Sequence, residues 1–275
     1  MKNSKINKVM LFNGACVSAK DIMPGDILMG PNGKRKIVSE IRQGYGEIFK
    51  VSSSEIKDYY VNAEDNLELI CDNEDGITLL NGQFIKNHEI IQLPVLKYLQ
   101  QKVPVKKNLK LRKAKADFMS KREHMTKDPY SEGSSLLNKE IKYIPNIFLK
   151  NDRIIRQQYL AGLIDSSGIV DGNEIRIHIS KPSKEIKKML IKDILFLCRS
   201  LGLKAFYQKE MIHIFGILSD IPFKKTSDII DTRNSDLFSI YVNSVGEGDC
   251  YMFDLLDEDK RYLLYDCTVS LAEQF

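Results

Sequence analysis

The 275-residue sequence lacks several features that would assign it to a class at once. No apolar run approaches the roughly 18 residues that a membrane-spanning helix needs. The N-terminal stretch has only four consecutive apolar residues, Val9 to Phe12, so we expect no secretory signal peptide. The five cysteines form no C-x-x-C pair, which argues against a disulfide framework and against a zinc site. We therefore expect an intracellular protein with reduced thiols and no membrane partner.

The net charge is also low. A value of +4 is too small to indicate a binding partner by itself. The positive charge is concentrated in residues 102–122, where nine Lys or Arg face one acid, Asp117, giving 9 − 1 = +8. Such a run is either a solvated face or an arm that binds nucleic-acid phosphates by releasing counterions. Its stretch KKNLKLRKAK also fits a nuclear import signal, which predicts a nuclear location. The cations of this arm that we expect to contact DNA are Lys106, Lys107, Lys110, Arg112, Lys113 and Lys115.

Both ends of the chain have the pattern of short strands. The turn signals Pro24-Gly25-Asp26 and Pro31-Asn32-Gly33 interrupt residues 8 to about 95. Residues 236–270 contain further short strands around a Gly-Glu-Gly turn. We expect the two strand-rich ends to pair with each other.

The middle of the chain, from residue 146 to about 225, predicts the order α-β-β-α-β-β-α. A helix over NDRIIRQQYLAGLID precedes a hairpin with Asp171-Gly172-Asn173 at its tip. An amphipathic helix follows, capped by Ser180 or Ser183 and ended by Gly202. Alternation in EIRIHIS separates a polar face, on which Arg176 and His178 are expected to contact DNA, from a packed face of Ile175, Ile177 and Ile179.

LAGLIDSSG at residues 160–168 matches seven of the nine positions of the LAGLIDADG signature, and the chain resembles the homing endonucleases that carry it. The flanks KVMLFNGACVSAKDIMPGDILMGPNG, IVSEIRQGYGEIFKV and MFDLLDEDKRYLLYDCTVS are similar to the two ends of a Hint (Hedgehog/intein) domain. The resemblance implies an α+β fold, in which a β-rich Hint-like domain is interrupted by one αββαββα endonuclease half. We expect a Hint-like N-terminal part at 1–95, a basic arm and linker at 96–145, an endonuclease-like unit at 146–230 and a Hint-like return at 231–275.

The resemblance also implies a catalytic centre. In the family, the acid at the eighth position of the signature holds Mg²⁺, which neutralises phosphate charge and lowers the pKa of an attacking water. Here the eighth position is Ser167, a neutral hydroxyl, and the sixth-position Asp165 lies about 200° away around a helix. Asp171 in the hairpin is the other acid that could substitute for it. Lys224 and Lys225 both fit the position of the family's catalytic lysine, so the candidates are Ser167, Lys224 and Lys225 for catalysis and Asp165 and Ser167 for metal binding.

The family packs two signature helices side by side, and the small residues Ala161 and Gly162 would permit that close approach. We find one signature and no second copy between residues 96 and 150, so the resemblance implies a homodimer for cleavage. Lys2 and Asp65 stand where an intein has its cysteine nucleophile and its histidine, and no His-Asn pair follows CTVS, so splicing is not expected. The open functions are an impaired endonuclease acting on double-stranded DNA, an inactive DNA-binding remnant, and a Hint-type splicing or autoprocessing domain.

Overall fold

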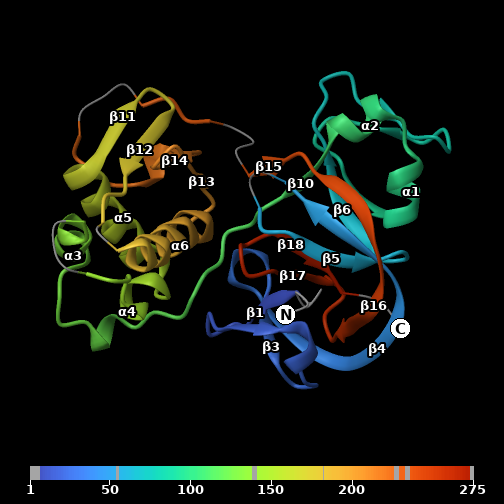
Figure 1. Ribbon diagram of the computed structural model, residues 1–275, viewed down its shortest axis with the longest axis horizontal. Coiled ribbons are helices and arrows are strands. Elements are labelled where there is room, and N and C mark those ends of the chain that lie inside the picture. Colours follow the sequence, from blue (N-terminus) through green and yellow to red (C-terminus); the bar gives the residue numbers. More distant parts are fainter. Residues whose placement is uncertain are drawn as a thin grey trace. The chain divides into compact units, whose positions relative to one another are not determined.

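The computed structural model describes residues 7–53, 56–137, 141–181, 183–225, 229–232 and 236–272. The chain forms two compact units (Figure 1): unit 1 comprises Met1–Ala114 and Leu237–Phe275, and unit 2 comprises Lys115–Asp236. Both contain helices and antiparallel sheets, in agreement with the predicted α+β class. No helix in these described ranges is long and apolar enough to span a membrane.

Unit 1 is built mainly from antiparallel strands of both chain ends. The long strands β4 (Arg35–Ser52) and β16 (Tyr241–Leu255) pair from Val38–Leu255 to Ser52–Tyr241, as the sequence predicts for the two ends. β3 (Ile27–Met29) and β5 (Tyr59–Asn62) also pair with β4. A second sheet has the order β15-β10-β6-β9, formed by β15 (Leu237–Phe238), β10 (Leu109–Arg112), β6 (Asn66–Cys71) and β9 (Ile90–Pro94).

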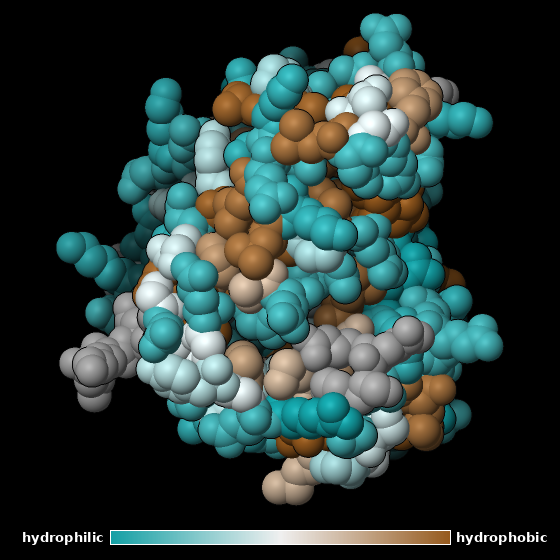
Figure 2. Space-filling view, turned by 90° about the vertical axis from the view of Figure 1, so that its right-hand side faces the viewer, coloured by the Kyte–Doolittle hydropathy of each residue, from teal (hydrophilic) through white to brown (hydrophobic). Residues whose placement is uncertain are grey.

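Smaller elements complete unit 1. Three two-stranded pairs are β1 (Lys8–Met10) with β2 (Cys16–Ser18), β7 (Ile77–Thr78) with β8 (Phe84–Ile85), and β17 (Arg261–Leu263) with β18 (Val269–Leu271). The short helices α1 (Val95–Gln100) and α2 (Val103–Asn108) connect β9 to β10. On the side where α1 and α2 lie, small apolar areas are scattered among hydrophilic ones (Figure 2). The core beneath includes the fully buried Leu28, Val51, Leu69 and Leu109.

Unit 2 contains α3 (Pro129–Ser135), α4 (Asn146–Leu149) and α5 (Arg153–Ser167), followed by β11 (Gly168–Asp171), β12 (Glu174–His178), α6 (Lys184–Ser200), β13 (Lys204–Gln208) and β14 (Met211–Phe215). From α5 to β14 the order is the predicted α-β-β-α-β-β. Of the predicted last helix, the described residues 217–225 form only a 3₁₀ turn at Leu218–Asp220. Pro222 explains the difference, because proline disfavours the helical conformation of the residue before it.

The four strands form one antiparallel sheet in the order β11-β12-β14-β13. Ile175, Ile177, Ile212 and Ile214 are fully buried on one face of this sheet. Ser183, one of the two predicted caps, is the N-cap of α6, and its hydroxyl accepts a hydrogen bond from the amide of Ile186 at 3.4 Å. Side chains that alternate with the buried isoleucines, among them Arg176 and His178, lie on the opposite, open face.

Candidate functional site

The LAGLIDSSG segment forms the C-terminal half of α5 and the first residue of β11. At the N-terminal end of α5, the carboxylate of Asp152 accepts a hydrogen bond from the amide of Ile155 at 3.0 Å. At the other end Gly168 is extended (φ −84°, ψ 146°), so the chain passes directly into β11. A Cβ on Gly168 would lie 2.8 Å from the carbonyl oxygen of Ile164, which explains the glycine. We call the end of this segment the helix tip: Asp165, Ser166, Ser167 and Gly168.

The carboxylate of Asp165 is surrounded by donors. Its Oδ1 accepts the amides of Lys224 and Lys225, each at 2.9 Å. Its Oδ2 accepts the amide of Lys224 at 2.7 Å and the hydroxyl of Tyr130, from α3, at 2.8 Å. The hydrogen bond to Asp165 raises the pKa of the Tyr130 hydroxyl. Asp165 therefore joins α3, the end of α5 and the Lys224–Lys225 segment.

The two predicted lysines do meet the helix tip, and their side chains lie in different places. Lys225 Nζ donates a hydrogen bond to the carbonyl oxygen of Gly168. Lys224 Nζ lies 4.5 Å from the centroid of the Tyr130 ring, within the range of a cation–π contact. Both residues are exposed. The structure thus brings Asp165, Lys224 and Lys225 together, although the sequence places the lysines about 60 residues away.

Ser167 is the last residue of α5, as the alignment to the signature requires. Its hydroxyl lies 3.1 Å from that of Ser166, which in turn donates to the carbonyl oxygen of Leu163 at 3.1 Å. Asp171, the other acid that could substitute, forms an ion pair with Arg176 at 2.9 Å instead. Within the described part of the chain, no group of three His, Cys, Asp or Glu side chains is arranged to hold a metal ion.

The packing face of α5 is covered by α3 of the same chain. A Cβ on Gly162 would lie 2.0 Å from the carbonyl oxygen of Tyr130, and one on Gly133 would lie 2.0 Å from that of Tyr159. Ala161 beside them is fully buried. The two contacts are reciprocal and have the same spacing, since 159 − 130 = 29 and 162 − 133 = 29. α3 thus makes with α5 the close helix contact that the sequence led us to expect from a second copy of the chain.

This contact corrects two expectations. The face that a homodimer would need is occupied within the chain, and a partner helix does lie between residues 96 and 150. The signal that could have revealed it is the pattern Tyr130-x-x-Gly133, which repeats Tyr159-x-x-Gly162. The same step of 29 from Asp165 and Ser167 leads to Leu136 and Asn138, so no acid stands at either corresponding position; Asn138 lies outside the described residues.

The basic run is folded into the units and is not an extended arm. Residues 103–108 form α2, and residues 109–112 form β10 between β6 and β15. Arg112 donates from Nε and Nη2 to Oε1 of the buried Glu68, at 2.9 and 2.7 Å. Lys113 is only 6% exposed, and its ammonium lies 5.6 Å from the ring centroid of Phe238. Lys113 is therefore buried in unit 1, and Arg112 is half-buried and paired with an acid of the same unit.

The remaining cations of the run differ in their surroundings. Lys110 Nζ donates to the hydroxyl of the serine that follows β15, at 2.7 Å, and Lys106 Nζ donates to a backbone carbonyl at 3.2 Å. Lys115, the first residue of unit 2, lies 3.7 Å from Asp220. Lys107 is exposed. Of the six predicted contacts to DNA in this run, Lys107 is the one with an exposed side chain.

The predicted DNA contacts on the sheet, Arg176 and His178, lie on the open face of β12. Acids accompany both: Arg176 pairs with Asp171 at 2.9 Å, and His178 Nε2 lies 3.9 Å from Glu210. The open face therefore carries charges of both signs, where the sequence pattern alone shows only its polarity.

A second pair occupies the same face on neighbouring strands. His213 of β14 and Glu174 of β12 share a hydrogen bond of 2.5 Å. The ring of Phe206 on β13 stacks on His213 with centroids 5.1 Å apart and planes 12° from parallel. These contacts hold the imidazole between an acid and an aromatic ring.

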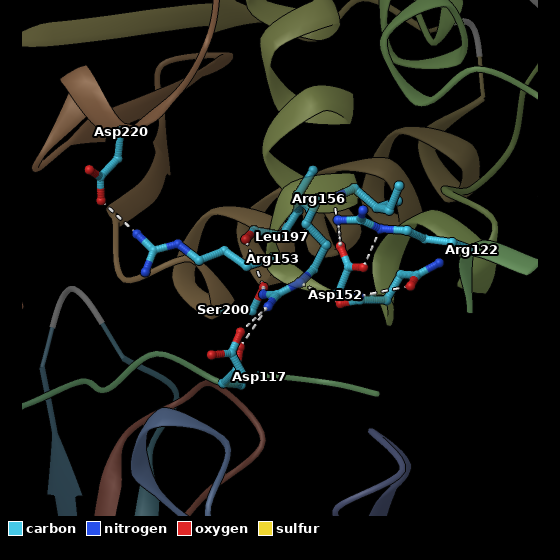
Figure 3. A network of polar contacts seen from close by, with 11 residues as sticks. Asp117, Arg122, Asp152, Arg153, Arg156, Leu197, Ser200 and Asp220 are labelled. Carbon is cyan, nitrogen blue, oxygen red and sulfur yellow. Dashed lines mark hydrogen bonds and ion pairs between the residues drawn. The ribbon is translucent and has the colours of Figure 1, made fainter. Parts of the chain in front are cut away.

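A buried arginine anchors the N-terminal end of α5 (Figure 3). Arg156 is fully buried and donates to the carbonyl oxygens of Asn151 (2.9 Å) and Ala116 (2.7 Å) and to the hydroxyl of Ser200 (2.7 Å). It also pairs with Asp117, the single acid of the basic run, at 3.2 Å. This network joins the first residues of unit 2 to α5 and α6.

In unit 1, Asp65, which the resemblance aligns with the intein histidine, ends a turn at Asn62–Asp65. Asp65 accepts hydrogen bonds from the backbone amide and the side-chain nitrogen of Asn62, both at 2.7 Å. Its carboxylate is thus part of a turn. Lys2, the position of the intein nucleophile, lies outside the described residues.

Comparison with curated proteins gives no match for this chain. Among solved structures, the gp41-1 intein is 13% identical, with a TM-score of 0.21, over 32% of this chain and 75% of that one. Residues 143–234, which lie within unit 2, match the family model described as homing endonuclease, and unit 2 is therefore similar to that family.

Proposed function

We propose that this protein binds double-stranded DNA through its homing endonuclease domain and that metal-dependent strand cleavage is impaired. The family match at residues 143–234 and the resemblance of LAGLIDSSG to the LAGLIDADG signature support the DNA partner. Hydrolysis of a phosphodiester in such an enzyme needs a divalent cation held by carboxylate oxygens. A chain that keeps the domain and lacks such carboxylates would still bind duplex DNA but would not hydrolyse its phosphodiester bonds.

The observation that carries this proposal is the state of the helix tip. Asp165 is its single carboxylate, and four hydrogen bonds from Tyr130, Lys224 and Lys225 surround it. The amide of Lys224 is shared between both oxygens, so three donor groups already engage most of the roughly four lone-pair sites of the carboxylate. Ser167 supplies a hydroxyl at the position where the signature has its metal-binding acid. The donor set at the tip therefore does not suit Mg²⁺.

The proposal includes a lineage. The inserted endonuclease unit and Hint-like flanks resemble the yeast HO mating-type-switching endonuclease and the intein of the yeast vacuolar ATPase. The pairing of β4 with β16 supports an insertion, because both chain ends form unit 1 around residues 115–236. The hydrogen-bonded turn at Asp65 supports the loss of splicing. With duplex DNA as its partner, we place the protein in the nucleus.

The test measures binding and cleavage on the same protein. Affinity of the purified chain for a short mixed-sequence duplex is followed by fluorescence anisotropy across a salt series, and plasmid cleavage is assayed with Mg²⁺ and with Mn²⁺. Each phosphate contact contributes about −0.9 to the slope of log K against log salt. Four cations of unit 2 that face the open sheet or the tip would give a slope of roughly −3.6; they are Arg176, Lys204, Lys224 and Lys225.

The expected outcome is salt-dependent binding without linearised plasmid. Replacing Arg176, Lys204 and Lys224 by Gln should flatten the slope by nearly three units. The same replacement of Lys110, Arg112 and Lys113 should leave the slope unchanged wherever the variant folds, because their side chains contact groups within unit 1. Absence of duplex binding at low salt would refute the DNA partner, and efficient double-strand cleavage would refute the impairment.

A further inference from the structure

The helix tip carries partial negative charge that attracts a cation, although the carboxylate of Asp165 is already engaged in hydrogen bonds. The last carbonyl groups of a helix have no partner within it, and the macrodipole places partial negative charge at its C-terminal end. Ser167 ends α5, and the carbonyl of Gly168 follows it. A cation is therefore stabilised at this point whatever residue stands at the eighth position of the signature.

A cation of the chain itself already occupies that point. Lys225 Nζ donates a hydrogen bond to the carbonyl oxygen of Gly168. The backbone of Lys225 is held in place at the same time, because its amide donates to Asp165 Oδ1 at 2.9 Å. Lys224 has the same kind of backbone bond to Asp165, but its ammonium lies over the ring of Tyr130. The two adjacent lysines therefore share the backbone hydrogen bond to Asp165 and differ in the position of the ammonium group.

We propose that the ammonium of Lys225 is the resident cation of the helix tip, where it neutralises a DNA phosphate in place of a divalent metal. Duplex binding is then independent of divalent metal. The inference rests on the proposed DNA partner and deepens it. It follows from the disagreement between the donor set and Mg²⁺, since an ammonium needs acceptors such as a carbonyl oxygen, whereas Mg²⁺ needs carboxylate oxygens in octahedral geometry.

The experiment compares duplex affinity in EDTA and in Mg²⁺ at matched ionic strength, by fluorescence anisotropy with the full chain. The wild-type affinity should be the same in both buffers within about twofold. Lys225→Met should weaken binding roughly eightfold near 0.1 M salt, the effect of one phosphate contact over a decade of salt, and should lower the salt slope by about one unit. Lys225→Arg keeps the charge and should retain the affinity.

Lys224→Met is the matched control for the tip. Lys224→Met also removes one positive charge, so the salt slope of DNA binding should fall by a similar amount. When Lys224→Met is combined with Ser167→Asp, the affinity for duplex DNA should remain insensitive to Mg²⁺, because Lys225 still lies at the tip. The combination of Lys225→Met with Ser167→Asp replaces the ammonium by a carboxylate, and its binding should become dependent on Mg²⁺.

Three results would contradict the inference. Wild-type binding that strengthens tenfold or more with Mg²⁺ would show that a metal occupies the tip. Equal affinity of Lys225→Met and wild type would show that this ammonium meets no phosphate. Failure of the double variant to respond to Mg²⁺, with its thermal unfolding unchanged, would show that Lys225 does not stand at the metal position. Absence of binding in every buffer would instead refute the DNA partner itself, and with it the inference.

Discussion

Replacing Gly162 by alanine tests the contact between α3 and α5. The added Cβ would lie 2.0 Å from the carbonyl oxygen of Tyr130 and 2.9 Å from the amide nitrogen of Ser134. Both atoms belong to the backbone of α3, so no flexible side chain can move aside. The helices must separate by more than about 1 Å to restore an ordinary contact, which loosens the packing on either side.

The size of the effect follows from two opposing terms. Overpacking in a close-packed core costs about 1–3 kcal/mol, and a backbone clash belongs at the upper end. Alanine gains about 1 kcal/mol over glycine from helix propensity. The net destabilisation of unit 2 is therefore about 2 kcal/mol. Unit 2 spans 236 − 115 + 1 = 122 residues, for which a loss of this size lowers the Tm by roughly 6–10 °C.

Thermal unfolding by circular dichroism measures the loss, and hydrogen exchange with mass spectrometry locates it. Exchange should increase in peptides covering residues 129–135 and 153–167. Gly133→Ala should behave alike, because its Cβ would lie 2.0 Å from the carbonyl oxygen of Tyr159. Gly46→Ala is the control, since nothing lies within 4 Å of its Cβ position. A Gly162→Ala variant as stable as wild type, with unchanged exchange in α3, would refute the close contact.

Arg156→Met should destabilise unit 2 by about 3–5 kcal/mol in thermal unfolding, because a fully buried guanidinium that donates to carbonyl and hydroxyl groups is lost; a change below 1 kcal/mol would contradict the network. At pH 8, iodoacetamide should modify Cys16 and Cys250 well before Cys198, because burial raises the pKa of the Cys198 thiol to about 12; mass spectrometry of early labelling would show the reverse order if the packing were wrong. Burial acts to raise the pKa of Asp152, but hydrogen bonds from Arg122 and two other donors lower it overall, so its stabilisation is present above the unfolded value of about 3.9 and is lost as pH falls through the folded value. The gap in Tm between wild type and Asp152→Asn should therefore close below about pH 4, and a gap that is constant with pH would exclude the charge effect.

Local patterns predicted the elements of unit 2 from α5 to β14. The alternation in EIRIHIS gave the two faces of β12, and the turn residues gave the hairpin between β11 and β12. Ser183 was one of the two predicted caps of α6. In each case the information lies within a few residues of sequence, because period, cap and turn chemistry are local properties.

Contacts between distant residues could not be predicted. The run of positive charge looked like an arm, but Arg112 pairs with Glu68, 44 positions away, and Lys113 lies over Phe238. α3 was missed because its seven residues, PYSEGSS, include a proline, a glycine and three serines, which is the composition of a loop. The Lys224–Lys225 segment was placed by family resemblance, while its amides bind Asp165 through geometry that no local pattern contains.

The most direct test of the helix tip is a titration with Mn²⁺ followed by electron paramagnetic resonance. Wild-type protein should show no site at the tip, because both oxygens of Asp165 already accept hydrogen bonds and the ammonium of Lys225 lies at the tip. Ser167→Asp combined with Lys225→Met should create a site that the wild type lacks. Tight binding of one Mn²⁺ by the wild type, abolished by Asp165→Asn with the fold intact, would contradict the account and make Asp165 the metal ligand.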